Sequence, residues 1–300
     1  MSNSDVTLLG FPESCIQARA VAERLGVGYG DVAIHRFPDE EDRLTLPECR
    51  ASHVILLRSL DRPNDKLVDL LLTCRTLRAS GARRLTLVAP YLCYMRQDTA
   101  FHTGEVVSQK IIGQWLAELF DDVVTVDPHL HRISRLEQAI PARGCVVTLT
   151  AAAPFSGYLA AQSATDDLVL LGPDYESEQW VSAIARASGL AYVIGRKTRR
   201  GDRSVGIELP EQVSFSGRTV VMLDDMASTG QTLAVAAAKA RDRGAVDVRV
   251  LVTHALFATG SIERLKAAGV SHIGSSDSIP HSSNVVSLAA LVAEGVRELL

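Results

Sequence analysis

Residues 219–232 read Thr-Val-Val-Met-Leu-Asp-Asp-Met-Ala-Ser-Thr-Gly-Gln-Thr, and this stretch decides the fold. The apolar run Val220–Leu223 is typical of a buried strand, and it ends in two adjacent carboxylates. A turn of small residues, Ala227–Gly230, comes next, and an alanine-rich helical stretch runs from Thr232 to Arg243. The pattern predicts a strand, a tight turn and a helix, which is the repeating unit of a parallel α/β sheet.

The acidic pair and the turn together predict a site for a phosphorylated sugar. Backbone N–H groups and hydroxyls at a helix N-terminus can hold a phosphate group. Asp224 and Asp225 would repel a bare phosphate, but carboxylates accept hydrogen bonds from ribose hydroxyls. The simpler alternative is an ordinary strand–turn–helix with an acidic cap. The joint pattern favours the sugar phosphate, held by Asp224, Asp225, Ser228, Thr229, Gly230, Gln231 and Thr232.

The length and composition limit the number of domains and the class of partner. A chain of 300 residues predicts two domains of about 150 residues each. A net charge of −4 gives no reason to expect a nucleic-acid partner. Five scattered cysteines without a CxxC spacing are typical of reduced thiols, and neither a signal peptide nor a transmembrane run is visible. We expect a cytoplasmic protein with no membrane partner.

Apolar runs alternate with helical patterns in both halves of the chain. This rhythm predicts an α/β protein of two doubly wound domains with mainly parallel sheets, and ligands at the carboxyl ends of the strands. The softest boundary is Arg143-Gly144, which suggests domains 1–144 and 145–286, with a last helix over 287–300 packing back on the first. The predicted strands are 6–9, 53–58, 85–89, 123–126, 168–171, 191–194, 220–223 and 248–253; the predicted helices are 14–25, 63–80, 105–120, 178–188 and 232–243.

Three further stretches carry chemistry. Arg96 and Gln97 follow a predicted strand, where they are placed to contact a nucleotide, or else form a solvated loop. His129 follows another strand, and a histidine there is more often structural than a ligand. The densest basic cluster is Arg196–Arg200 with Arg203, which Gly195 and Gly201 bracket. A charge run is usually a solvated face, but phosphoryl transfer needs mobile positive charge, and we favour a functional loop.

Taken together, these stretches resemble the ribose-phosphate diphosphokinases, or PRPP synthetases. The stretch 219–232 is similar to the loop that binds phosphoribosyl diphosphate (PRPP), which the type I phosphoribosyltransferases share. Pro90–Asp98 followed by Gly104-Glu105 resembles the ATP-binding signature of the diphosphokinases, which the transferases lack. Details of that stretch, such as Phe101, look more like the archaeal-type branch. Asp127-Pro128-His129 and Phe37–Glu41 match two more motifs of the same family.

The resemblance implies a phosphoribosyltransferase-like fold in both domains and a reaction of ATP with ribose 5-phosphate that gives AMP and PRPP. It implies Mg²⁺ as cofactor, with His129 and Asp174 near the metal, and Lys197 and Arg199 as catalytic residues. The loop at Phe37 reaches a neighbouring subunit in the family, which implies a homo-oligomer: a dimer, tetramer or hexamer. The implied ATP-binding residues are Phe37, Asp39, Glu41, Arg96, Gln97, Asp98 and His129.

Three departures from the family pattern keep alternatives open. Thr99-Ala100 stands where a basic pair is usual, Tyr175-Glu176-Ser177 replaces a small glycine-containing loop, and Glu40 replaces a glycine. One alternative is a catalytically weak or inactive regulatory homologue. Another is a diphosphokinase that acts on an altered sugar phosphate. A phosphoribosyltransferase is disfavoured by the Arg96-Gln97-Asp98 motif.

Overall fold

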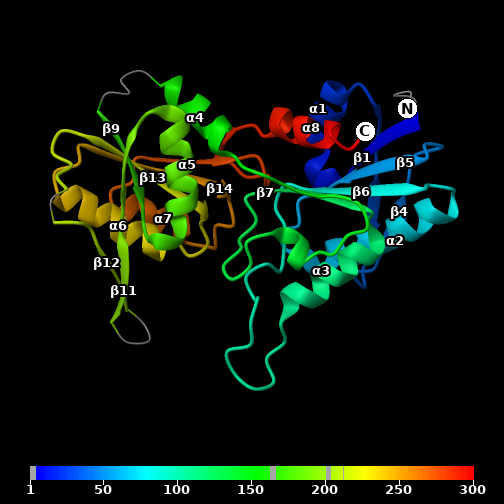
Figure 1. Ribbon diagram of the computed structural model, residues 1–300, viewed down its shortest axis with the longest axis horizontal. Coiled ribbons are helices and arrows are strands. Elements are labelled where there is room, and N and C mark those ends of the chain that lie inside the picture. Colours follow the sequence, from blue (N-terminus) through cyan, green and yellow to red (C-terminus); the bar gives the residue numbers. More distant parts are fainter. Residues whose placement is uncertain (1–4, 163–166, 201–203, 212) are drawn as a thin grey trace. The chain divides into compact units, whose positions relative to one another are not determined.

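A computed structural model describes residues 5–162, 167–200, 204–211 and 213–300 (Figure 1). The chain divides into two compact units. The first unit is residues 1–150 with 288–300, and the second is residues 151–287. The division therefore falls after Thr150 instead of at Arg143-Gly144, because the strand that follows Gly144 pairs within the first sheet. The cores of the two units form separate clusters of buried side chains.

The first unit contains a six-stranded sheet in the order β2-β1-β5-β6-β7-β8, and every neighbouring pair is parallel. The central strands are buried on both faces and read as continuous apolar runs, as a sheet covered by helices on both sides requires. In Figure 1, α1 and α8 cover one face of this sheet, and α2 and α3 cover the other. The strands are β1 (Val6–Gly10), β2 (Gly28–Asp31), β5 (His53–Leu57), β6 (Arg84–Ala89), β7 (Asp122–Val126) and β8 (Val146–Leu149).

The first helix of this unit ends where the sequence supplies a stop signal. Helix α1 (Cys15–Leu25) ends at Gly26, whose φ of 67° is the left-handed conformation that glycine adopts without strain. The other helices are α2 (Pro63–Ala79), α3 (Ser108–Leu119) and α8 (Ala289–Arg297). Helix α8 packs closely on β8, because a Cβ atom at Gly295 would lie 2.7 Å from a methyl carbon of Leu149. The predicted helix 105–120 was too long, since the chain becomes helical only at Ser108.

The second unit repeats the plan with the parallel order β10-β9-β13-β14-β15-β16. Helix α4 packs against α5, and α6 packs against α7. Strand β13 runs to Met226, beyond the predicted end at Leu223, so the two aspartates lie inside the strand. The strands are β9 (Leu168–Gly172), β10 (Ala191–Ile194), β13 (Thr219–Met226), β14 (Asp247–His254), β15 (His272–Ser276) and β16 (Asn284–Val286); the helices are α4 (Ala152–Ala160), α5 (Glu178–Ser188), α6 (Gln231–Asp242) and α7 (Ser261–Ala267).

Each unit also carries a two-stranded antiparallel ribbon. In the first unit, β3 (Ala33–Arg36) pairs with β4 (Asp42–Thr45). In the second unit, β11 (Arg196–Arg200) pairs with β12 (Ser204–Glu208). The basic cluster was predicted as a loop, and this was wrong, because Lys197 and Arg199 pair with Ile207 and Val205 across a strand ladder. Gly201 and Arg203 lie outside the described residues.

Candidate active site

Three aspartates gather at the carboxyl edge of the second sheet. Asp224 and Asp225 lie near the end of β13, and Asp174 follows the end of the adjacent parallel strand β9. Asp174 also caps a short 3₁₀ turn, Tyr175–Ser177, by accepting a hydrogen bond from the Ser177 N–H at 3.3 Å. Strand pairing therefore brings carboxylates that are fifty residues apart in the sequence to one edge, as ligand sites in parallel sheets require.

At this acidic edge, the Asp224 carboxyl has a raised pKa. Burial raises the pKa of the Asp224 carboxyl well above its ordinary value, and the nearby charges of Asp225 and Asp174 raise it further. Asp225 itself is only 2% exposed. Grouped carboxylates of this kind favour partners that donate hydrogen bonds or carry positive charge, such as sugar hydroxyls or a cation.

A tight turn connects these aspartates to α6. Gly230 immediately precedes the helix with φ 69°, the left-handed region that favours glycine. Thr229 and Gln231 are exposed, Ser228 and Thr232 are half-buried, and Gly230 is buried. The first turn of a helix leaves N–H groups without intrahelical partners, and the helix dipole places partial positive charge there. The turn 227–230 and the first turn of α6 thus form an anion-binding geometry beside the acidic pair.

The β11–β12 ribbon begins next to the end of β9. The N–H of Gly195 donates to the carbonyl of Gly172 at 2.8 Å, and a Cβ atom at Gly195 would lie 2.7 Å from the carbonyl oxygen of Pro173. This close approach places Nζ of Lys197 at 3.6 Å from Oδ2 of Asp174. The side chain of Arg199 lies outside the described residues, although its backbone belongs to β11.

In the first unit, the stretch Arg96–Asp98 follows β6 through a folded loop. Asp98 is buried, and its Oδ1 accepts a hydrogen bond from Nη1 of Arg132 at 2.5 Å, while Oδ2 is buried without a protein partner. Arg96 is exposed, and the side-chain amide of Gln97 donates to the carbonyl of Thr99 at 2.9 Å. The Arg132 guanidinium also lies 5.4 Å from the ring centre of Phe101. Arg132 therefore joins the loop after β6 to the loop after β7.

The turn after β7 carries His129. It begins at Asp127, whose φ of 39° is strained for a residue other than glycine. His129 is half-buried, and its ring lies edge-on to the ring of His131 with the centroids 4.1 Å apart. Strained backbone at the carboxyl end of a strand is typical of binding sites. This is the same edge of the first sheet that carries Asp98.

Phe37, Asp39 and Glu41 form the tip of the β3–β4 hairpin. The N–H of Phe37 donates to the carbonyl of Glu41 at 2.8 Å, and Oδ1 of Asp39 accepts from the N–H of Glu41 at 3.3 Å. Phe37 is 39% exposed, which is high for a phenylalanine. Glu40 adopts φ 70°, so it occupies a left-handed position of the kind that glycine favours.

The predicted residues thus form two sets, one in each unit. Asp174, Lys197, Asp224, Asp225 and the turn 228–232 lie in the second unit; Phe37, Asp39, Glu41, Arg96, Gln97, Asp98 and His129 lie in the first. His129 and Asp174, the predicted metal neighbours, therefore belong to different units. Within the described ranges, no group of three or more histidine, cysteine or acidic side chains is arranged to hold a metal ion without help from a ligand.

Two arginines at these sites carried no recognisable signal in the sequence. Arg132 contacts Asp98 from a position 34 residues away, and Arg264 donates to the carbonyl of Thr229 from 35 residues away. Neither arginine belongs to a motif, and only the fold brings each one to its partner. Local sequence patterns report strand ends and turns, but they carry no information about such distant contacts.

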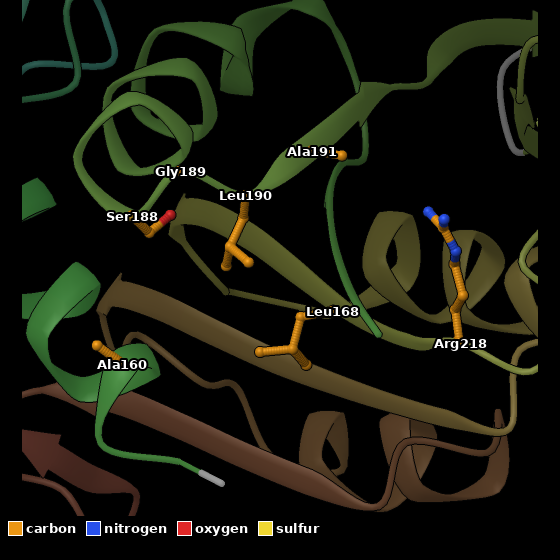
Figure 2. A pocket seen from close by; sticks show the side chains of 7 residues that line it. All are labelled: Ala160, Leu168, Ser188, Gly189, Leu190, Ala191 and Arg218. Carbon is orange, nitrogen blue, oxygen red and sulfur yellow. The ribbon is translucent and has the colours of Figure 1, made fainter. Parts of the chain in front are cut away.

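A cavity of about 440 Å³ lies elsewhere in the second unit (Figure 2). Its walls include Leu168 and Ala191, which are the first residues of β9 and β10, together with Arg218, which precedes β13. The cavity therefore opens at the amino ends of the strands. None of the predicted site residues lines it, so it is separate from the acidic edge.

Comparisons with known proteins agree with this geometry. Residues 8–119 match the family described as the N-terminal domain of ribose phosphate pyrophosphokinase, and residues 209–299 match the phosphoribosyl synthetase-associated domain. None of the helices in the described part of the chain is both long and apolar enough to cross a membrane.

Two relatives align with this chain over nearly their full length. The ribose-phosphate pyrophosphokinase of Methanopyrus kandleri is 33% identical over 97% of this chain and 99% of its own. Ribose-phosphate pyrophosphokinase 2 of Archaeoglobus fulgidus is 31% identical over 95% of this chain and 98% of its own. Both relatives are archaeal, as the sequence details predicted. The crystal structure of phosphoribosylpyrophosphate synthetase from Mycobacterium smegmatis has a TM-score of 0.82 over 99% of both chains at 24% identity, which establishes the fold.

Proposed function

This chain belongs to the ribose-phosphate pyrophosphokinase family, and we propose that its residues carry that reaction as follows. The enzyme transfers the diphosphoryl group of ATP to ribose 5-phosphate. The 1-hydroxyl of the sugar attacks the β-phosphorus, the bond between the α,β-bridging oxygen and the β-phosphorus breaks, and AMP and PRPP are the products. The observation that carries the assignment of residues is the acidic edge of the second sheet, which adjoins an anion-binding turn and Lys197.

Ribose 5-phosphate binds at the carboxyl end of β13 in this proposal. Asp224 and Asp225 accept hydrogen bonds from the 2- and 3-hydroxyls of the ribose. Residues 228–232 hold the 5-phosphate with backbone N–H groups and hydroxyls at the start of α6. The close succession of carboxylates and turn along the chain suits a ligand that has hydroxyls at one end and a phosphate at the other.

ATP binds through the first-unit residues. Arg96 and Gln97 offer hydrogen-bond donors beside the nucleotide, and Arg132 holds Asp98 in place beneath them. His129 lies near the phosphates. The exposed ring of Phe37 offers an aromatic face to an adenine, as expected for a hairpin tip that reaches another subunit.

Lys197 and Arg199 act on the transferred group. Catalysis of phosphoryl transfer is mostly positioning and charge stabilisation, and a cation beside Asp174 can neutralise charge that develops on the diphosphoryl oxygens. In support of this role, Nζ of Lys197 lies 3.6 Å from Oδ2 of Asp174 at the carboxyl edge of the sheet. When a triphosphate is present, the lysine exchanges this partner for phosphate oxygens.

The donor set suits Mg²⁺. This ion is usually held by one or two carboxylates together with substrate phosphates, not by an all-protein cage, and Asp174 at the crowded acidic edge supplies such a carboxylate. His129 is the first-unit residue proposed to lie near the metal-bound phosphates. Mg²⁺ held there would supply positive charge that offsets the charge of the triphosphate during diphosphoryl transfer.

The hairpin tip and the free cysteines also bear on the oligomeric state of the protein and on its place in the cell. A hairpin tip that completes a neighbour's nucleotide site has no use in a monomer, so we expect a homo-oligomer in the cytoplasm. The five cysteines are free, and Cys74 and Cys93 are buried. Analytical ultracentrifugation tests the assembly: a single active species near 32.3 kDa would rule it out.

Activity is tested with purified chain, ATP, Mg²⁺ and ribose 5-phosphate, followed by mass spectrometry of the products. Formation of AMP and PRPP in equal amounts is expected. Replacing ribose 5-phosphate by other pentose and hexose phosphates distinguishes a diphosphokinase with an altered sugar phosphate from the proposed enzyme.

A further inference from the structure

We infer that Arg264 is a positioning residue for the phosphate-binding turn, and that it sets the affinity for ribose 5-phosphate without touching the sugar phosphate. This inference rests on the proposed function of residues 228–232. Arg264 lies in α7, outside every motif that marks the site in the sequence.

Two successive carbonyls of the turn are held from one side. The N–H of Ala258 donates to the carbonyl of Ser228 at 3.0 Å. Nη1 of Arg264 donates to the next carbonyl, that of Thr229. Both donors come from the single stretch 258–264, so both carbonyls point towards that stretch.

The direction of these carbonyls fixes the direction of two N–H groups. In a trans peptide the C=O and the following N–H point to opposite sides, and the described residues contain no cis peptide. The N–H groups of Thr229 and Gly230 therefore point away from α7. Successive N–H groups next to a left-handed residue form a concave anion site, and Gly230 has that conformation.

The residues that support the turn are closely packed. Ser261 is fully buried, and its hydroxyl donates to the carbonyl of Ala258 at 2.6 Å. Leu265 is fully buried in the core, and a Cβ atom built on Gly230 would lie 3.4 Å from its Cγ atom. Ser261 and Leu265 flank Arg264 along α7, so the helix fixes the base of its long side chain.

Arginine suits this role better than a neutral donor. Its guanidinium is charged at every accessible pH and offers several N–H groups in a fixed plane. It therefore holds the Thr229 carbonyl and adds positive charge behind an anion site. Removing it frees the Thr229–Gly230 peptide to rotate, and the anion site loses both its geometry and part of its field.

The experiment measures binding of ribose 5-phosphate to the full-length chain by isothermal calorimetry without ATP, and steady-state kinetics with ATP and Mg²⁺. Arg264→Ala is expected to weaken ribose 5-phosphate binding about tenfold and to raise its KM equally, since the loss of a charged hydrogen bond is of this size. The kcat at saturating sugar phosphate and the KM for ATP stay within twofold. Arg264→Lys recovers part of the affinity, because a lysine retains the positive charge and can still donate a hydrogen bond.

Arg241→Ala is the matched control. Like Arg264, Arg241 donates to backbone carbonyls of the same unit, but these are the carbonyls of Ala245 and Val246 at the far end of α6. The Arg241→Ala substitution is expected to leave ribose 5-phosphate binding unchanged. Unchanged binding in Arg264→Ala, or an equal loss in Arg241→Ala, overturns the inference.

The outcomes separate this inference from the proposed function. If the unmodified chain binds ribose 5-phosphate but forms no PRPP, the proposed reaction fails while calorimetry still decides the role of Arg264. If the unmodified chain forms PRPP and Arg264→Ala binds the sugar phosphate equally well, only the inference fails. If the unmodified chain does not bind ribose 5-phosphate at all, both fail.

Discussion

Nζ of Lys197 lies 3.6 Å from Oδ2 of Asp174, which ties the β11–β12 ribbon to the carboxyl end of β9. The lysine side chain is 33% exposed, so solvent screens the pair and the contact contributes little to stability. The contact matters because it fixes where the lysine side chain lies. The ribbon delivers a cation to the edge of the sheet where three aspartates gather.

Lys197→Ala is therefore expected to lower kcat by about 10²–10³, because the positive charge acts on the transition state. The KM for ribose 5-phosphate and the melting temperature change little. Steady-state kinetics and a thermal melt measure these quantities. Arg196→Ala is the matched control, since adjacent side chains on a strand point to opposite faces. A kcat for Lys197→Ala equal to that of the control contradicts a catalytic role.

Asp225→Ala is expected to behave differently. Asp225 is buried and is proposed to accept hydrogen bonds from ribose hydroxyls, so its loss should raise the KM for ribose 5-phosphate about 10- to 100-fold. Calorimetry of sugar-phosphate binding gives an independent measure. Asp247→Ala removes an aspartate that pairs with Arg249 at the amino end of β14, and it should leave this KM unchanged. Equal effects of the two substitutions argue against direct contact of Asp225 with the sugar.

Arg132→Ala tests the first-unit site. It leaves the buried carboxyl of Asp98 without its charged partner, and we expect a loss of about 1–3 kcal/mol in unfolding free energy. It should also raise the KM for ATP while the KM for ribose 5-phosphate stays constant. Arg135→Ala removes an exposed arginine that lies three residues after Arg132 and pairs with Glu137, and it provides the baseline. An unchanged KM for ATP in Arg132→Ala would show that Asp98 needs no such support.

Glu40→Gly is expected to stabilise the protein. Glu40 has φ 70°, and a left-handed conformation costs a non-glycine residue about 1–2 kcal/mol. Glycine adopts it freely, so the melting temperature should rise. Glu41→Gly makes the same chemical change one position further on, where φ is not positive, and should lower or preserve the melting temperature. A fall in melting temperature for Glu40→Gly would show that the Glu40 side chain stabilises the hairpin.

The sequence predicts most of the sheet, because buried parallel strands read as apolar runs bounded by glycine, proline or charge. His53–Leu57 and Leu168–Gly172 are clear examples. It misses the strands β2, β8, β15 and β16 of the two main sheets, most of which are short and only partly buried. It also misses the ribbon strands β3, β4 and β12 and the short helices α4 and α7. It assigns Arg196–Arg200 to a loop, because a run of charged residues lacks the alternation of apolar and polar residues that marks a half-buried strand.

The sequence likewise predicts some residues of the candidate site and misses others. Asp224, Asp225 and the turn 228–230 are visible in the sequence because they are contiguous with β13. The raised pKa of Asp224 is not visible, because it depends on Asp174 arriving from another strand. Arg132 and Arg264 escape detection for the same reason, since each meets its partner only after the chain has folded.

Synthesis of PRPP from ATP and ribose 5-phosphate by this chain can be tested directly. The direct measurement is a time course with purified chain, Mg²⁺ and ATP labelled on the β-phosphorus, with and without ribose 5-phosphate. We predict that the label moves to PRPP, with one AMP released for each PRPP formed, and that chelating the metal stops the reaction. The absence of labelled PRPP from a folded chain that binds both substrates would contradict the proposed reaction and would favour a regulatory homologue.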